Sequence, residues 1–187
     1  LKTVDTLLQK ADELKNQTRS LHIATCAPAP LWKFTAEFGK SFPSITITSE
    51  MPDEDNIIAL LLSETAQLAI VRKEIQAEAI ETVPFMDEQL FMKIPNSNPL
   101  SRKTAIHFAD LAGATIREYT EIGFWHKLHR EEIAHAHYIE YKDFMIYMNV
   151  VKSPDTLTFV TELGHTKSEA RTGCKTIPII EIGRAHV

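Results

Sequence analysis

Hydrophobic residues recur with a helical period at the start of the chain. An i, i+3, i+4, i+7 stripe between polar or charged positions is formed by Val4, Leu7, Leu8, Ala11 and Leu14. The stripe predicts an amphipathic helix over residues 1–19. A helix this short needs a partner for its apolar side. Periodicity leaves two partners open: the domain that follows, or the same helix of a second copy.

Strands and helices alternate over the next fifty or so residues. Short apolar or β-branched runs predict strands at 21–25, 45–48 and 68–71, and helical periodicity predicts helices at 31–42 and 53–62. The run at 68–71 is entirely apolar, which is typical of a strand buried on both faces. This alternation predicts an α/β fold with a parallel sheet, in which ligands bind at the carboxyl ends of the strands.

The second half of the chain has more closely spaced strands. We expect strands at 80–85 and 89–94, and the turn-rich stretch at 95–99 is where we expect one lobe to end and another to begin. The remaining expected elements are a short helix at 108–111, helices at 124–134 and 145–151, and strands at 115–119, 138–141, 157–160 and 176–180.

Composition narrows the class of protein. The chain has 187 residues, 44% of them hydrophobic and 24% charged, and its net charge of -5 argues against a nucleic-acid-binding surface on this chain. No apolar run reaches the roughly 18 residues of a membrane helix, and no signal-peptide pattern opens the chain. Cys26 and Cys174 lie far apart and indicate no disulfide framework. We expect a cytoplasmic protein with no membrane partner.

Three stretches, in their order and spacing, are similar to a known family. The amphipathic helix leads into a strand at 21–24, residues 61–70 read LLSETAQLAI, and the NPLS sequence at 98–101 precedes the short helix and strand that follow. Together they resemble the effector-binding region of bacterial LysR-type transcriptional regulators. The resemblance extends from about Val4 to Ile180.

The resemblance implies a type 2 periplasmic-binding-protein fold, with two α/β lobes and an effector cleft between them. Residues 1–19 would be the end of a linker helix that pairs in a homodimer or homotetramer. Residues 20–95 would form the first lobe, incomplete at its C-terminus, residues 96–176 the second lobe, and residues 177–187 the return toward the first. We expect a DNA-binding head to precede Leu1 and to be absent from this chain, and residues 181–187 to be a non-native tail.

In the first lobe, the loop Thr25-Cys26-Ala27-Pro28 matches the loop that lines the effector cleft in the family. It precedes a helix, whose dipole and amide groups favour an anion, although Pro28 and Pro30 each lack an amide hydrogen. An ordinary strand-to-helix turn is the alternative. We expect Cys26 to be a core or cleft cysteine rather than a redox sensor.

Four further residues are candidates near the cleft. Asp53 is the expected N-cap of its helix. Arg72 matches a position that faces the cleft in some relatives and could hold a carboxylate with two hydrogen bonds, and an ordinary surface arginine is the alternative. In the second lobe, Thr120 and the backbone of Gly123 are expected effector contacts. Glu121 would repel an anion, so it points away or selects a cationic or hydroxylated ligand.

Histidines on the helix expected at 124–134 have the spacing of a metal site. His126 and His129 lie i, i+3, as zinc ligands do. Trp125, Leu128 and Ile133 already define the buried side of that helix. We therefore expect His126 and His129 to face solvent, and we expect no metal.

The sequence has no nucleophile–base set with a local signature and no phosphate-binding glycine loop. We expect no catalytic activity and no cofactor. The resemblance implies a small-molecule effector-binding domain of a LysR-type DNA-binding regulator, which would contact DNA through the head that precedes this chain. The alternative is a transport-type solute-binding protein of the same fold, which would need a secretory signal.

Overall fold

The computed structural model describes residues 20–165, 173–180 and 185–186 of the chain. The predicted linker helix at 1–19 lies outside these residues, as does most of the expected tail at 181–187. The chain divides into two compact units, Leu1–Asp87 with His186–Val187, and Glu88–Ala185. Each unit is described by itself below.

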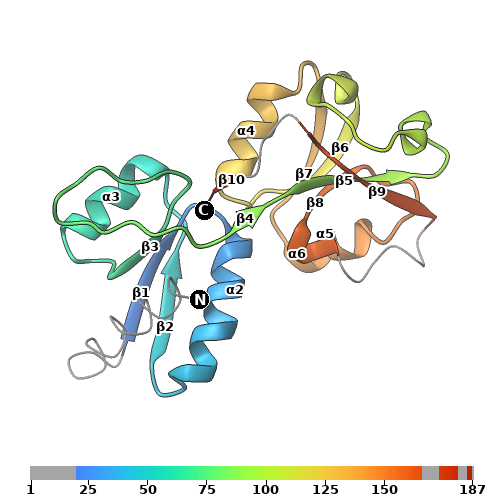
Figure 1. The fold of residues 1–187 in the computed structure, drawn as a ribbon. Coiled ribbons are helices and arrows are strands. Elements are labelled where there is room, and N and C mark those ends of the chain that lie inside the picture. Colours follow the sequence, from blue (N-terminus) through green and yellow to red (C-terminus); the bar gives the residue numbers. More distant parts are fainter. Residues whose placement is uncertain (1–19, 166–172, 181–184, 187) are drawn as a thin grey trace. The chain divides into compact units, whose positions relative to one another are not determined.

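The described elements are named as in Figure 1. The helices are α2 (Pro28–Ser41), α3 (Glu54–Leu62), α4 (Phe124–Glu132), α5 (Phe144–Val150) and α6 (Glu162–His165), with 3-10 turns at Pro99–Arg102 and Phe108–Leu111. The strands are β1 (Ser20–Thr25), β2 (Thr46–Glu50), β3 (Leu68–Ile70), β4 (Asp87–Glu88), β5 (Leu90–Pro95), β6 (Thr115–Tyr119), β7 (His137–Tyr141), β8 (Thr158–Thr161), β9 (Cys174–Pro178) and β10 (Ala185–His186). No helix among the described residues is long and apolar enough to cross a membrane.

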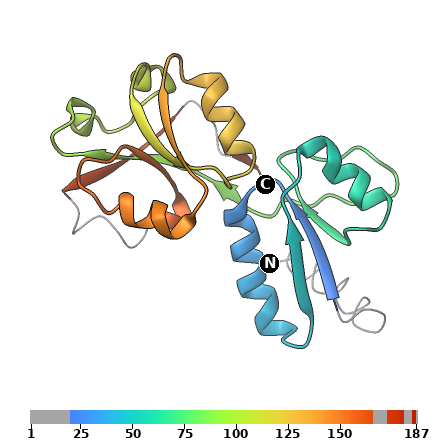
Figure 2. The same ribbon diagram turned by 180° about the vertical axis from the view of Figure 1, so that it is seen from behind.

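The first unit contains a parallel sheet in the order β2-β1-β3 (Figures 1 and 2). Ala24 pairs with Glu50 and Thr25 pairs with Ile70. The carboxyl ends of the three strands therefore lie side by side at one end of the sheet. The chain crosses from β1 to β2 and then back past β1 to β3. Right-handed crossovers in these two directions put α2 and α3 on opposite faces, and the central strand β1 is accordingly the most buried.

Two predictions for the first unit are wrong. β3 is an edge strand, and Leu68 and Ala69 are only half-buried, because β1 rather than β3 takes the central place. Residues 80–85 form no strand and belong to the long loop that leads to β4 (Figure 1). Pro84 has no amide hydrogen for a ladder, and the segment pairs with no strand of the described chain. Apolar residues alone do not make a strand without a neighbour.

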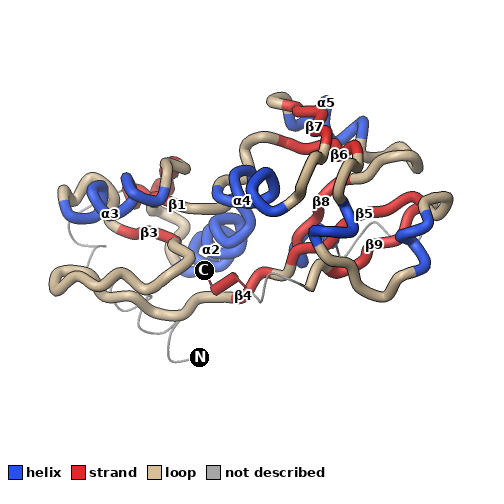
Figure 3. Tube along the Cα trace, turned by 90° about the horizontal axis from the view of Figure 1, so that it is seen from above, coloured by secondary structure: helices blue, strands red, loops and turns tan. Residues whose placement is uncertain are grey.

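The second unit contains an antiparallel sheet in the order β8-β5-β9 and a parallel pair, β6-β7. The Arg117 amide of β6 donates to the Leu157 carbonyl beside β8 over 2.9 Å. β5 runs between β8 and β9, next to β9 in Figure 3, and its Met92 and Ile94 are fully buried. β5 therefore belongs to the second unit, and the division falls after Asp87, earlier than the 95–99 turn where the sequence placed it.

Parallel strands joined through helices occur in both units, which confirms the predicted α/β class. In the second unit, α4 connects β6 to β7 and lies against them (Figures 1 and 2). The loops that leave the carboxyl ends of these parallel strands hold the candidate residues.

Candidate functional site

The loop after β1 is closed by its own hydrogen bonds. Thr25 Oγ1 donates to the Ala27 carbonyl over 2.7 Å, and the Cys26 amide donates to the Ile70 carbonyl of β3 over 3.0 Å. Thr25, Cys26 and Ala27 are all buried. The strand-to-helix turn is therefore rigid, and the Thr25 hydroxyl already has a partner within it.

The N-terminus of α2 offers few donors to an anion. The helix begins at the half-buried Pro28, and Pro30 is its third residue, so only Ala29 of the first three residues has an amide hydrogen. No acidic residue lies in this first turn. The helix dipole would still attract an anion, but this helix start lacks most of the amide hydrogens that would bind it.

Asp53 and Arg72 lie at the same edge of the first sheet. Asp53 is the N-cap residue of α3, as predicted, although its side chain makes no capping hydrogen bond. Arg72 follows β3 and forms a two-bond ion pair with Glu54 of α3, Nε to Oε1 at 2.5 Å and Nη2 to Oε2. Two of the five guanidinium hydrogens are thus committed to Glu54, which leaves Arg72 fewer for an effector carboxylate.

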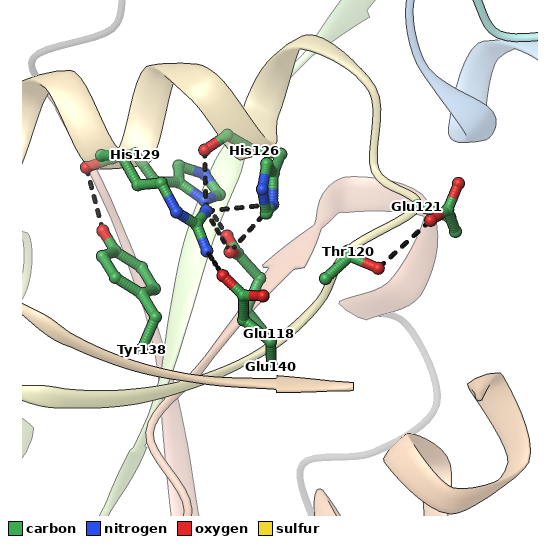
Figure 4. A network of polar contacts seen from close by, with 8 residues as sticks. Glu118, Thr120, Glu121, His126, His129, Tyr138 and Glu140 are labelled. Atoms are coloured by element: carbon green, nitrogen blue, oxygen red, sulfur yellow. Dashed lines mark hydrogen bonds and ion pairs between the residues drawn. The ribbon is translucent and has the colours of Figure 1, made fainter. Parts of the chain in front are cut away.

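The second set of candidate residues follows β6. Tyr119 pairs with Tyr141 at the ends of the two parallel strands, and the Thr120 amide donates to the Tyr141 carbonyl over 3.1 Å. The Thr120 hydroxyl donates to Glu121 Oε1 over 3.2 Å (Figure 4). Gly123 has φ 65° and ψ −138° immediately before α4, a conformation that side chains disfavour. The loop from Thr120 to Gly123 is therefore a sharp turn between β6 and α4.

Beside this loop lies a group of polar side chains around a buried carboxylate, which we call the Glu118 cluster: Glu118 of β6, His126, His129 and Arg130 of α4, and Glu140 of β7 (Figure 4). Glu118 is only 2% exposed. Its Oε1 lies 2.7 Å from His129 Nδ1, and its Oε2 lies 2.6 Å from Arg130 Nη1 and 3.2 Å from His126 Nδ1. Arg130 Nη2 donates to Glu140 Oε1 over 2.5 Å.

β7 adds Tyr138 to the edge of the cluster. Its hydroxyl donates to the His129 carbonyl over 2.9 Å, and the Arg130 guanidinium lies 4.4 Å from the centre of its ring. The guanidinium is thus held by two carboxylates and an aromatic face. α4 is fixed to both strands of the parallel pair.

His129 corrects the prediction that this histidine faces solvent, because its side chain is fully buried. Burial lowers the pKa of His129 more than the Glu118 hydrogen bond raises it. The imidazole is therefore neutral, and Nδ1 donates to Glu118. Its Nε2 has no hydrogen-bond partner in the described part of the protein and is the unprotonated nitrogen, enclosed by the stacked ring of Phe159.

Glu118 remains ionised. Burial raises the pKa of this carboxyl, but the hydrogen bonds from His129 and Arg130 and the charge of Arg130 outweigh burial and leave the pKa below its ordinary value. No group of three or more histidine, cysteine, aspartate or glutamate side chains in the described chain is arranged to hold a metal. The histidine nitrogens instead contact the carboxylate and guanidinium of the cluster.

Sequence reasoning missed Glu118 and a second buried acid, Glu88. Glu88 Oε2 accepts from Trp125 Nε1 over 3.2 Å, while Oε1 has no partner among the described residues. Burial is the largest cause that raises the pKa of Glu88. One signal for Glu118 was available: it lies two residues from buried Ile116, so both side chains face the same side of β6.

Comparisons with known proteins identify the family and the fold of this chain. The model of the LysR substrate binding domain matches residues 17–178. A comparison with curated proteins gives no match. Among solved structures, the reduced OxyR regulatory domain from Pseudomonas aeruginosa is similar with a TM-score of 0.64 and 13% identity, over 89% of this chain and 84% of that one.

Two further structures share the fold. HinK, a LysR family transcriptional regulator from Pseudomonas aeruginosa, gives a TM-score of 0.58 and 13% identity over 100% of this chain and 69% of that one. The effector binding domain of QuiR in complex with shikimate gives 0.53 and 17%, over 88% and 82%. At these identities the structures establish the fold, and the family model establishes membership. The chain therefore belongs to the LysR substrate-binding domain family, the non-catalytic, effector-binding part of LysR-type transcriptional regulators.

Proposed function

We propose that the effector of this domain binds to the loops at the carboxyl edges of its parallel sheets, in a cleft between two lobes. The observation on which this rests is the strand register, which brings the ends of β1, β2 and β3 to one edge, and those of β6 and β7 to another. Ligands of open α/β sheets bind beyond such edges. The proposed contacts are Thr25, Cys26, Ala27, Pro28, Asp53, Arg72, Thr120 and Gly123.

The polar contacts differ in how free they are for a ligand. The Thr120 hydroxyl is half-buried and its acceptor, Glu121, is exposed, so a ligand can replace or join this bond. Arg72 contacts an effector carboxylate by giving up its ion pair with Glu54. The exposed acid beside Thr120 and the occupied guanidinium favour an effector with hydroxyl or amine donors over a simple anion.

Regulation would follow from selection of one arrangement of the lobes. A ligand that binds one arrangement more tightly shifts the population toward it. In a homodimer or homotetramer, this change would be passed to DNA-binding heads. The regulator would act in the cytoplasm. A complete gene that instead encodes a secretory signal before Leu1 would favour the transport-type solute-binding protein.

A thermal-shift screen tests the proposed site, because a ligand that binds only the folded state raises its apparent stability. Shikimate is the first compound to test, since the similar QuiR domain was solved with it. For any compound that shifts the melting temperature, we expect the shift to fall in Thr120→Val and Arg72→Ala and to persist in Arg102→Ala, an exposed arginine in a 3-10 turn. An undiminished shift in both site variants would place the ligand elsewhere.

A further inference from the structure

One ring nitrogen of His126 lies between a donor and an acceptor. His126 Nδ1 is 3.0 Å from Arg130 Nη1 and 3.2 Å from Glu118 Oε2. A guanidinium can only donate, and an ionised carboxylate can only accept. The same nitrogen can accept from Arg130 only while it carries no proton, and it can donate to Glu118 only when it carries one.

Arg130 Nη1 has more acceptors than hydrogens while His126 Nδ1 carries no proton. Nη1 has two hydrogens and three acceptors within reach: Glu118 Oε2 at 2.6 Å, the His126 carbonyl at 2.9 Å and His126 Nδ1 at 3.0 Å. Protonation of His126 removes one of these acceptors and provides a new donor to Glu118. The two hydrogens of Nη1 then have two acceptors, and Nδ1 turns from Nη1 toward Glu118.

The cluster holds two carboxylates near His126, and the Arg130 guanidinium 3.0 Å from Nδ1 must move away when this nitrogen is protonated. Two carboxylates, Glu118 of β6 and Glu140 of β7, face the single guanidinium of Arg130 from α4, so one negative charge is unbalanced while both histidines are neutral. Tyr138 of β7, whose pKa burial raises to about 12, stays neutral. His129 is fully buried, whereas the His126 side chain is 34% exposed and open to protons from solvent.

His126 is also joined to the proposed effector loop. Its amide donates to the Gly123 carbonyl over 3.1 Å in the first turn of α4, and Glu118 is two residues before Thr120 on β6. Figure 4 shows Glu118 and His126 on the two chain segments that lead into and out of this loop. A change in the bond between these two side chains acts on both ends of the loop.

We propose that His126 is a proton-operated positioning residue, whose Nδ1 switches from Arg130 to Glu118 and thereby fixes the Thr120–Gly123 loop. The inference rests on the proposed function, in which this loop contacts the effector. In the protonated form, Glu118 holds the first and the last turn of α4. In the neutral form it holds only the last turn, and the loop is less constrained.

NMR of the whole 15N-labelled chain tests the switch without an effector. Ring nitrogen signals report the tautomer and charge of each histidine, and amide signals of residues 120–123 report the loop. We expect neutral His126 to hold its proton on Nε2 and to gain a second proton, on Nδ1, in acid. The loop amides should shift with the same midpoint, while His129 stays neutral with its proton on Nδ1.

Variants separate the switch from general effects of pH. His126→Gln should abolish the coupled loop shifts, and His137→Gln, at an exposed histidine of β7, should keep them. Loop amides that shift alike in wild type and His126→Gln would overturn the proposal, as would a neutral His126 with its proton on Nδ1.

The outcomes also separate this proposal from the effector site. If the thermal shift caused by an effector depends on Thr120 but the amide shifts of the loop do not depend on His126, the proposed switch is wrong and the proposed function stands. If the amides follow His126 but the effector shift is independent of Thr120 and Arg72, the switch stands and the effector site is wrong.

Discussion

At the scale of single residues, Glu118 is the group that holds the polar cluster of the second unit together. Glu118→Gln keeps the shape of the side chain but removes the charge that Arg130 and His129 contact. We expect the free energy of unfolding to fall by roughly 2–4 kcal/mol in urea titrations at neutral pH, because Arg130 loses its buried counter-charge and buried His129 loses a charged acceptor. Glu140→Gln, at an exposed ion pair, should cost less than about 1 kcal/mol. Equal losses would contradict the dominant role of Glu118.

Glu118 and His129 should make the free energy of unfolding fall in acid. The folded pKa of Glu118 lies below the ordinary value of 4.5, so its contribution is complete above 4.5 and is lost as the pH falls through the folded pKa. The folded pKa of His129 lies below 6.5, so below that pH the unfolded chain takes up a proton that the folded chain does not. Urea midpoints should decline below 6.5, and Glu118→Gln should show a smaller further decline below 4.5.

Glu88 should respond in the opposite direction. Its carboxyl is 1% exposed and its pKa is raised above 4.5, mainly by burial. A raised folded pKa means that its contribution is complete below 4.5 and is lost as the pH rises through the folded pKa. Glu88→Gln should therefore melt at a higher temperature than wild type at neutral pH. The difference should shrink in acid, and a lower melting temperature at both pH values would refute this account.

At the scale of elements, the start of α4 depends on a glycine that the interior of α2 does not need. Gly123 has φ 65°, whereas Gly39 lies within α2 and a Cβ added there meets no atom within 4 Å. Gly123→Ala should lower the unfolding free energy by about 1–3 kcal/mol. Gly39→Ala should raise it by roughly 0.5–1 kcal/mol, because alanine suits a helix interior. Thermal unfolding of the two variants compares the sites directly.

The elements that the sequence predicts well are those defined by local periodicity. The strand–helix alternation from β1 to β3 is confirmed, because each element has its own apolar pattern. The edge position of β3 and the irregular 80–85 segment depend on which strands become neighbours, and no local pattern encodes that. Both predictions failed for one reason: a strand forms only beside a partner strand, which can be distant in the sequence.

The burial of His129 has a related explanation. It lies four residues after buried Trp125 and four before buried Ile133, on the same side of α4, so helical spacing alone permits it to be buried. A histidine is buried only where another group satisfies it, and that group, Glu118, comes from β6. The Arg72–Glu54 pair was missed for the same reason, since it joins the end of β3 to the start of α3.

At the scale of the whole molecule, each unit has a core of its own. Ile57 of α3 is fully buried in the first unit, and Ile94 of β5 is fully buried in the second. Replacing either by alanine should cost about 2–5 kcal/mol. Amide hydrogen exchange should become faster mainly in the unit that holds the substitution, because each core stabilises its own sheet.

Under the proposed function, an effector should make the stability of each unit depend on the other. A ligand that contacts Arg72 and Thr120 together makes its binding energy depend on the fold of both units, so it should slow exchange in both. In Ile57→Ala the same ligand should also protect the second unit less than in wild type, since the first unit is folded less of the time. A ligand that contacts one unit alone would slow amide exchange only in that unit. Comparison of Ile57→Ala with Ile94→Ala would then show which unit binds the ligand.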